Sequence, residues 1–251
     1  AETSGKFAVL RDFINVVISS PLPAGLKSKN VAIILENKPR LFDLIESVLL
    51  GCKMGQTTKR YVGNTIKAGK GRSSAEKQTL VHLIPADGAY SKDSSLIDVT
   101  KFDLVFIFDS SVDSESPFVR QLRNQNRTNE AVAIRLVPMK AVEHCQYYYK
   151  DMALKSEDPL APTAPKLSES YLYRLISSIV CLREHIGILP PDLNPIYNHG
   201  LNYFSLFVKE VLEGIIPAWP LPELPDIPHF SPQEVERSLL TEAHFHYTPY
   251  D

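Results

Sequence analysis

The chain has 251 residues, of which 44% are hydrophobic and 22% are charged, and its formal net charge at pH 7 is -2. This composition is typical of a globular protein with one large domain or two small ones. The slightly acidic charge excludes a general attraction to nucleic acid or membranes, so such binding would need a local patch. No apolar run approaches the roughly 18 residues of a membrane-spanning helix, and we expect no membrane partner. The chain begins at Ala1 and not at Met, and we expect it to be part of a longer protein.

The first elements predicted along the chain are a helix, a strand and a second helix. Apolar residues at helical spacing predict a helix over residues 3–19. "VAIILE" (31–36) is a short run rich in β-branched residues and predicts a strand. Pro39 is suited to the first position of the next helix, whose apolar side continues to Gly51.

Four further apolar runs predict strands at 57–62, 79–84, 102–108 and 131–137. Most of these runs are apolar on both sides, as in a parallel sheet that helices cover on both faces. A short helix is predicted to begin at Ser116 and Pro117. These features predict an α/β fold with a single parallel sheet, in one RecA-like or Rossmann-like lobe over about residues 25–145.

The C-terminal part changes character. A proline-rich connector (155–170) precedes helical patterns at 172–186 and 201–213, and a proline-rich strap then leads to a capping box at Ser231. We therefore predict a RecA-like lobe over 1–150, in which residues 1–24 form a leading helix. A helical extension over 165–251 is predicted to pack on this lobe.

Cysteine and histidine usage predicts neither disulfides nor a metal site. Three cysteines lie far apart in the chain, and none belongs to a CxxC pair (Cys52, Cys145 and Cys181). Such a sparse set suits a reducing compartment. Cys181 with His185, and His244 with His246, offer two ligands each, whereas a metal site needs three or four.

The chain also lacks a phosphate-binding loop. "AGKGRSS" (68–74) has glycines and cations, but the spacing of Gly-Lys-Ser/Thr is wrong and no helical pattern follows directly. Asp109 follows the apolar run 104–108, at the end of a strand where ligand sites of parallel sheets lie. We interpret Asp109 as an end-of-strand cap, with a retained ligand role as the alternative, and we expect no cofactor.

Several segments, read in order, resemble the second RecA-like lobe of superfamily 2 helicases, notably SWI/SNF-type remodellers. They are "VAIILENKPRLFDLIESVLLG", "KRYVGNT", "FDLVFIFDSSVDSESPFVRQLR" and "AIRLVPMKAVEH". That family supplies arginines that stabilise phosphoryl transfer. Here Arg120, Arg123 and Arg127 are not at the family's spacing, and the partner lobe with its Walker lysine is absent from these residues. The resemblance therefore implies a lobe that is not an enzyme, and a lobe of an active helicase is the less favoured alternative.

A narrower resemblance extends over almost the whole chain. "AETSGKFAVLRD", "DLIESVLLG", "LPPDLNPIY", "WPLPELPDI" and "EVERSLLTEAHF" are similar to the fungal family of class II histone deacetylase complex subunits 2 and 3. The resemblance implies a nuclear, non-catalytic scaffold in chromatin silencing, with the other subunits of the complex as partners. It also implies a coiled coil elsewhere in the full-length protein and a possible dimer through regions outside this chain. The same domain occurs in a fission-yeast telomere protein, so an adaptor between shelterin, telomerase and a silencing deacetylase is the alternative.

Two surfaces are candidates for such contacts. A basic stretch contains the candidate contacts to double-stranded DNA, with Tyr61 as a candidate for base stacking: Lys59, Arg60, Lys67, Lys70 and Arg72. The proline strap and the last predicted helix contain apolar residues that could bind a partner helix or peptide: Trp219, Leu221, Phe230, Leu239 and Phe245. Both sets are predictions, because a basic loop and an apolar helix side also occur as ordinary surface and core.

Overall fold

The computed structural model describes residues 5–61, 78–89, 95–109, 112–138 and 200–215, and the single positions 143, 233 and 237. The chain divides into two compact units. The first unit joins Ala1–Leu136 to Asn194–Leu221, and the second joins Val137–Leu193 to Pro222–Asp251. Almost all described residues belong to the first unit. Within the described residues, no helix is both long and apolar enough to cross a membrane.

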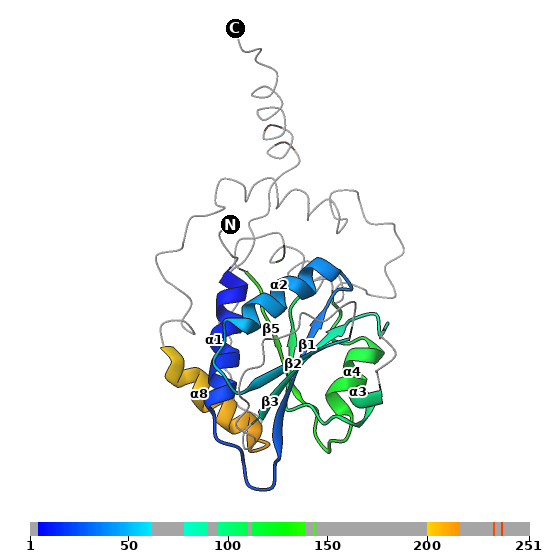
Figure 1. The fold of residues 1–251 in the computed structure, drawn as a ribbon. Helices are drawn as coiled ribbons and strands as arrows, with labels where there is room; N and C mark the ends of the chain where they lie inside the picture. The colour runs from blue at the N-terminus through cyan, green and yellow to red at the C-terminus, as the bar shows by residue number, and fades with distance from the viewer. Residues whose placement is uncertain are drawn as a thin grey trace. The chain divides into compact units, whose positions relative to one another are not determined.

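The first unit contains a parallel sheet, in which the described residues form five strands (Figure 1). The strands are β1 (Ser28–Leu35), β2 (Gln56–Arg60), β3 (Gln78–Pro85), β4 (Leu104–Ile107) and β5 (Val132–Arg135). Their order is β2-β3-β1-β4-β5, and every neighbouring pair is parallel. Central strand β1 is buried from Val31 to Leu35, which explains why its sequence is a continuous apolar run and does not alternate.

The described helices are α1 (Gly5–Ser19), α2 (Pro39–Leu50), α3 (Ser95–Val99), α4 (Pro117–Asn124) and α8 (Gly200–Leu212). Prolines at the first position begin α2 and α4, where the missing N–H is not needed. Helix α8 is followed by Gly214, whose φ of 80° is a left-handed conformation that favours glycine.

One face of the sheet packs on α1, α2 and α8. Its core contains the ring pair of Phe13 and Phe106, with centroids 5.2 Å apart, and the edge-to-face pair of Phe13 and Phe207 at 5.8 Å. Helix α8 thus lies against α1, although the two are far apart in sequence. On the opposite face, Ile97 of α3 and Val119 and Leu122 of α4 pack on the strands (Figure 1).

The predicted α/β fold with one parallel sheet is confirmed. All five predicted strands are present, as are the helices predicted at 3–19, 39–51, 116 onward and 201–213. Helix α3 was not predicted, because five residues contain too little periodicity to identify a helix. The domain boundary near residue 150 stays a prediction, and most of the predicted extension lies outside the described residues.

Candidate functional site

The carboxyl ends of β1 and β4 are joined by Asp109. The Glu36 N–H donates to Asp109 Oδ2 at 2.7 Å, so the carboxylate binds the backbone just after β1. The Asp109 carbonyl accepts from Arg135 Nη1 at 3.2 Å, while Arg135 Nη2 donates to the Val112 carbonyl at 2.8 Å. Asp109 therefore connects three strand ends through hydrogen bonds, which is the role of a structural cap.

A buried lysine supports the same edge from the side of α1. Lys6 Nζ donates to the Phe108 carbonyl and lies 4.3 Å from the centroid of the Phe108 ring. A charge this buried is stabilised by charge-assisted hydrogen bonding and by the negative face of an aromatic ring. Asn37 Nδ2 adds a bond of 2.8 Å to Asp87 Oδ2, and this bond, with the N–H of Ala89, lowers the pKa of Asp87 below its ordinary value. The polar groups named at this edge thus bind one another.

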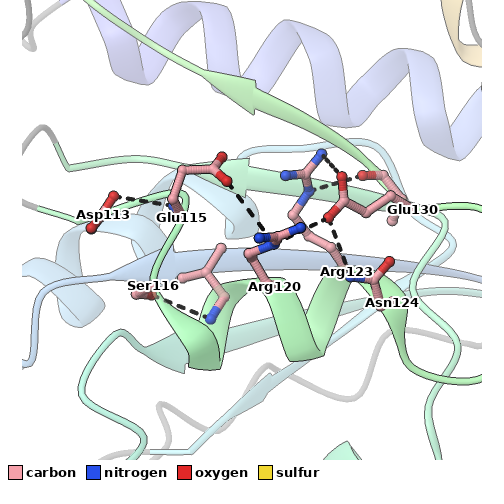
Figure 2. A network of polar contacts seen from close by, with 9 residues as sticks. Asp113, Glu115, Ser116, Arg120, Arg123, Asn124 and Glu130 are labelled. Carbon is pink, nitrogen blue, oxygen red and sulfur yellow. Dashed lines mark hydrogen bonds and ion pairs between the residues drawn. The ribbon is translucent and has the colours of Figure 1, made fainter. Parts of the chain in front are cut away.

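The arginines of the α4 region differ in how firmly they are held (Figure 2). Arg123 Nε donates to the Ala131 carbonyl at 3.1 Å, and its Nη2 lies 3.1 Å from Glu130 Oε2. Arg127 Nη1 donates to the Phe102 carbonyl at 2.6 Å. Both guanidinium groups therefore fasten the end of α4 to neighbouring backbone, which leaves them badly placed to stabilise a transferred phosphoryl group.

Arg120 is the exposed member of this set. Its side chain is 58% exposed, and its Nε lies 4.0 Å from Glu115 Oε2 and 3.9 Å from Glu130 Oε1 (Figure 2). These are distances at the limit of an ion pair, so neither carboxylate holds the guanidinium tightly.

The candidate DNA contacts fall in three places. Lys59 is exposed on β2, at one end of the strand order, as the prediction requires. The Arg60 side chain is 2% exposed, and its Nη1 lies 2.5 Å from Asp43 Oδ1 and 3.4 Å from Glu46 Oε2 of α2. This position in the core turns the Arg60 guanidinium away from any DNA phosphate. Lys67, Lys70 and Arg72 lie outside the described residues, and their DNA contact stays a prediction.

Tyr61 was predicted as a stacking residue, and its place is also in the core. Its hydroxyl lies 2.8 Å from His82 Nδ1, while His82 Nε2 lies 3.3 Å from Asn30 Oδ1. Burial raises the pKa of Tyr61 to about 12 and lowers the pKa of His82 to about 4, with a smaller contribution to the latter from Lys59. A protonated tyrosine and a neutral histidine satisfy both bonds, with Tyr61 donating to Nδ1 and Nε2 donating to Asn30. Tyr61 is therefore fixed against β3 and is not available for an exposed base.

The predicted partner-binding residues all lie outside the described residues (Trp219, Leu221, Phe230, Leu239 and Phe245). Among the described residues, no three histidine, cysteine or acidic side chains come together as metal ligands.

A sequence profile described as "Class II histone deacetylase complex subunits 2 and 3" matches residues 1–208. The chain belongs to this family. It is 33% identical over 250 residues to HDA1 complex subunit 3 of Saccharomyces cerevisiae, an alignment that covers 98% of this chain and 34% of that protein. It is 30% identical over 249 residues to HDA1 complex subunit 3 of Eremothecium gossypii, again with 98% and 34% coverage. The chain thus spans about a third of the length of the curated relatives it matches.

A solved structure supports the same assignment. A chain from "Structural and functional studies of the yeast class II Hda1 HDAC complex" matches with a TM-score of 0.72 and 32% identity, covering 97% of this chain and 72% of that chain. The family resemblance expected from the sequence motifs is therefore confirmed. Both curated relatives are named as subunit 3 of an HDA1 complex.

The burial of three cations, Lys6, Lys29 and Arg60, escaped the sequence reasoning. Lys29 is 1% exposed, and its Nζ donates to the carbonyls of Val17, Ile18 and Ser20, at the C-terminal end of α1. For Arg60 the alternation of β2 was a signal, because Lys59 and Arg60 must point to opposite faces of the strand and cannot both meet DNA. Lysines such as Lys6 and Lys29 give no comparable signal, since their role depends on a carbonyl brought near by the fold.

Proposed function

We propose that this chain is a non-catalytic scaffold domain of a histone deacetylase complex and that it links the deacetylase to chromatin in the nucleus. The observation that carries the proposal is that the charged groups considered for a nucleotide site hold the fold instead, Asp109 at the carboxyl ends of the strands and the two arginines beside the amino ends of β4 and β5. Asp109, Arg123 and Arg127 each bind backbone groups of this chain. A group held in this way stabilises the fold, and its release for chemistry would cost that stability.

Assembly with the complex is the first test. Family membership and the names of the relatives support the other subunits of the deacetylase complex as partners. Tagged full-length protein is expected to co-purify with the catalytic deacetylase subunit, and the purified protein alone should neither deacetylate histone peptides nor hydrolyse ATP. Turnover of ATP that Arg123→Gln abolishes would contradict the proposal, since it would give that guanidinium a catalytic role.

The link to chromatin runs through DNA, through protein, or through both. If the domain binds DNA directly, the candidate contacts are exposed Lys59 and three cations outside the described residues, Lys67, Lys70 and Arg72. Binding of a labelled 30-base-pair duplex is measured across a salt series with the triple variant Lys67, Lys70 and Arg72→Ala. Contacts to phosphates predict affinity that falls steeply with salt and is lost in the variant.

A matched variant removes three exposed cations elsewhere on the chain, Lys27, Lys38 and Lys101→Ala. Equal losses in both triple variants would indicate general charge attraction and contradict a DNA-binding patch. No binding at low salt would leave the protein route, in which an apolar peptide bound by the C-terminal part should respond little to salt. The alternative role as a telomere adaptor predicts co-purification of shelterin or telomerase subunits in the same pull-down, and their absence would remove it.

A further inference from the structure

The N-terminus of α4 begins with a serine-proline pair at the surface. Ser116 is half-exposed, and its Oγ accepts from the Val119 N–H at 3.4 Å as the cap of the helix (Figure 2). Its backbone, with φ -58° and ψ 144°, is extended because the following proline disfavours the helical conformation. Protein kinases bind their substrates as extended segments, so Ser116 already has the required backbone conformation, whereas the turn of α4 that follows it would have to open.

A weakly held cation lies one helical turn after Ser116. Arg120 is four residues from the cap, and its Nε is 3.9–4.0 Å from the carboxylates of Glu115 and Glu130. The Arg120 N–H bonds to the Ser116 carbonyl at 3.0 Å, so the two residues are fixed on the same turn. A long, exposed guanidinium with two distant partners can exchange them for a closer and more highly charged one at little cost.

We propose that Ser116 is a phosphorylation site for a proline-directed protein kinase and that Arg120 binds the resulting phosphate at the N-terminus of α4. In the reaction, Ser116 Oγ forms a bond to the γ-phosphorus of ATP while the bond to the bridging oxygen of ADP breaks. The hydroxyl proton passes to the catalytic base of the kinase, and ADP leaves. The product has about two negative charges where backbone N–H groups and Arg120 both favour an anion.

A second serine-proline pair shows that the dipeptide alone does not make such a site. Ser20 precedes Pro21 just after the C-terminal end of α1, and its hydroxyl donates to the Val16 carbonyl at 2.8 Å. Its own carbonyl accepts from buried Lys29 Nζ at 2.6 Å. A phosphate at Ser20 would break the bond to Val16 and place negative charge beside helix carbonyls, where an anion is unfavourable. The two sites therefore differ in the sign of the field that a phosphate would meet.

The phosphate would also change the charge of the outer surface of α4. Glu115 and Glu130 now share Arg120 and Arg123 there. When Arg120 moves to the phosphate, Glu115 loses its cation, and the surface gains negative charge. This surface would then repel nucleic acid and attract basic protein segments, a regulation that stands independently of the scaffold role proposed above.

The test treats the full-length protein with a cyclin-dependent-class kinase and ATP, and maps the sites by mass spectrometry. The tested protein carries the substitutions Ser231→Ala and Thr248→Ala, because these two residues also precede prolines and could be phosphorylated by the same kinase. Phosphate is expected at Ser116 and not at Ser20, and Ser116→Ala should remove it. Incorporation confined to Ser20, or none in this chain, would overturn the proposal.

Genetic incorporation of phosphoserine at position 116 tests the role of Arg120 separately from recognition by the kinase. Phosphoserine there should raise the Tm by about 2–4 °C relative to serine, and Arg120→Gln should reduce that increase to the part that the helix N-terminus supplies. Phosphoserine at position 20 is the matched control and should lower the Tm. An equal increase with and without Arg120 would overturn its assignment as the phosphate-binding residue.

Discussion

The β2–α2 contact and the outer surface of α4 each pair arginine with two carboxylates, yet the two regions are built very differently. Under α2, Arg60 is 2% exposed and lies 2.5 Å from Asp43 and 3.4 Å from Glu46, which is itself 4% exposed. On α4, Arg120 is 58% exposed and approaches Glu115 and Glu130 only to 4.0 and 3.9 Å. Both regions use a guanidinium and two carboxylates, but the groups differ in how deeply they are buried and in how far apart they lie.

This difference separates charges that hold the fold together from charges that can take new partners. Removal of Arg60 would take away the guanidinium that lies 3.4 Å from the buried Glu46 carboxylate, so the pair resists change. Exposed Arg120 exchanges its carboxylates with water at almost no cost. At the carboxyl ends of β1 and β4 the Asp109 carboxylate is already bonded to the backbone, so regulation and partner binding are expected at exposed, exchangeable charges instead.

The largest predicted effect tests the buried half of this comparison. Arg60→Met should lower the free energy of unfolding by about 3–5 kcal/mol, because it leaves the Glu46 carboxylate buried without its guanidinium. Urea denaturation measures the change. Lys59→Met, one residue away and exposed, is the matched control and should change stability by less than about 0.5 kcal/mol.

A double variant identifies the cause. Replacing both charges, in Arg60→Met with Glu46→Leu, should recover a large part of the lost stability, since no buried charge remains. If the double variant is as unstable as Arg60→Met alone, lost packing over the Phe42 ring, 5.3 Å from the guanidinium, explains the effect instead.

The next prediction extends the comparison to a buried group that is neutral. Burial lowers the pKa of His82 to about 4, so the unfolded chain, with an ordinary pKa near 6.5, binds the proton first as the pH falls. The free energy of unfolding should therefore fall by about 3 kcal/mol between pH 6.5 and pH 4, and not above pH 6.5. Thermal unfolding across this range measures the slope.

His82→Gln is the matched variant, because an amide can still bond to Tyr61 and Asn30 but does not titrate. Burial also raises the pKa of Asp103, which acts in the opposite sense at the lower end of the window. The difference between the chain and the variant removes this contribution. An identical pH slope in both proteins would show that His82 is not the titrating group.

The sequence predicted the fold better than it predicted the site, for a physical reason. The strands at β1 and β4 are continuous apolar runs, and Pro39, Pro117 and Gly214 mark helix ends through local backbone preferences. These signals come from neighbouring residues in the chain, so a single sequence is enough to recognise them.

Site residues depend on what the fold brings near them. In the sequence, Arg60 does not differ from the other cations of the basic stretch. Only the fold shows that Glu46 of α2 lies 3.4 Å from its guanidinium. Asp109, by contrast, was interpreted correctly as a cap, because the end of a buried strand already indicates what a carboxylate there must bind. Exposed Lys59 fits its predicted role, and its contact with DNA stays a prediction.

The smallest predicted effect tests the exposed half of the comparison. Arg120→Gln should change the free energy of unfolding by less than about 0.5 kcal/mol, since both ion pairs are long and solvated. Arg123→Gln is the matched change on the same helix and should cost more, because its Nε bond to the Ala131 carbonyl and its contact with Glu130 are both lost. Equal losses in the two variants, measured by urea denaturation, would contradict the distinction between held and exchangeable arginines.

The packing of α8 on α1 has a consequence for the chain as it is being synthesised. Phe13 of α1 packs on Phe207 of α8. Residues Val137–Leu193 of the second unit are synthesised before α8, so this part of the core cannot form until they have been made. At roughly 5–20 residues per second, the interval between the end of β5 and the end of α8 is on the order of 4 to 15 seconds. During that time the nascent polypeptide has its sheet but lacks one wall of its hydrophobic interior. Chaperones that recognise exposed aromatic side chains should therefore engage this protein before α8 emerges and release it afterwards.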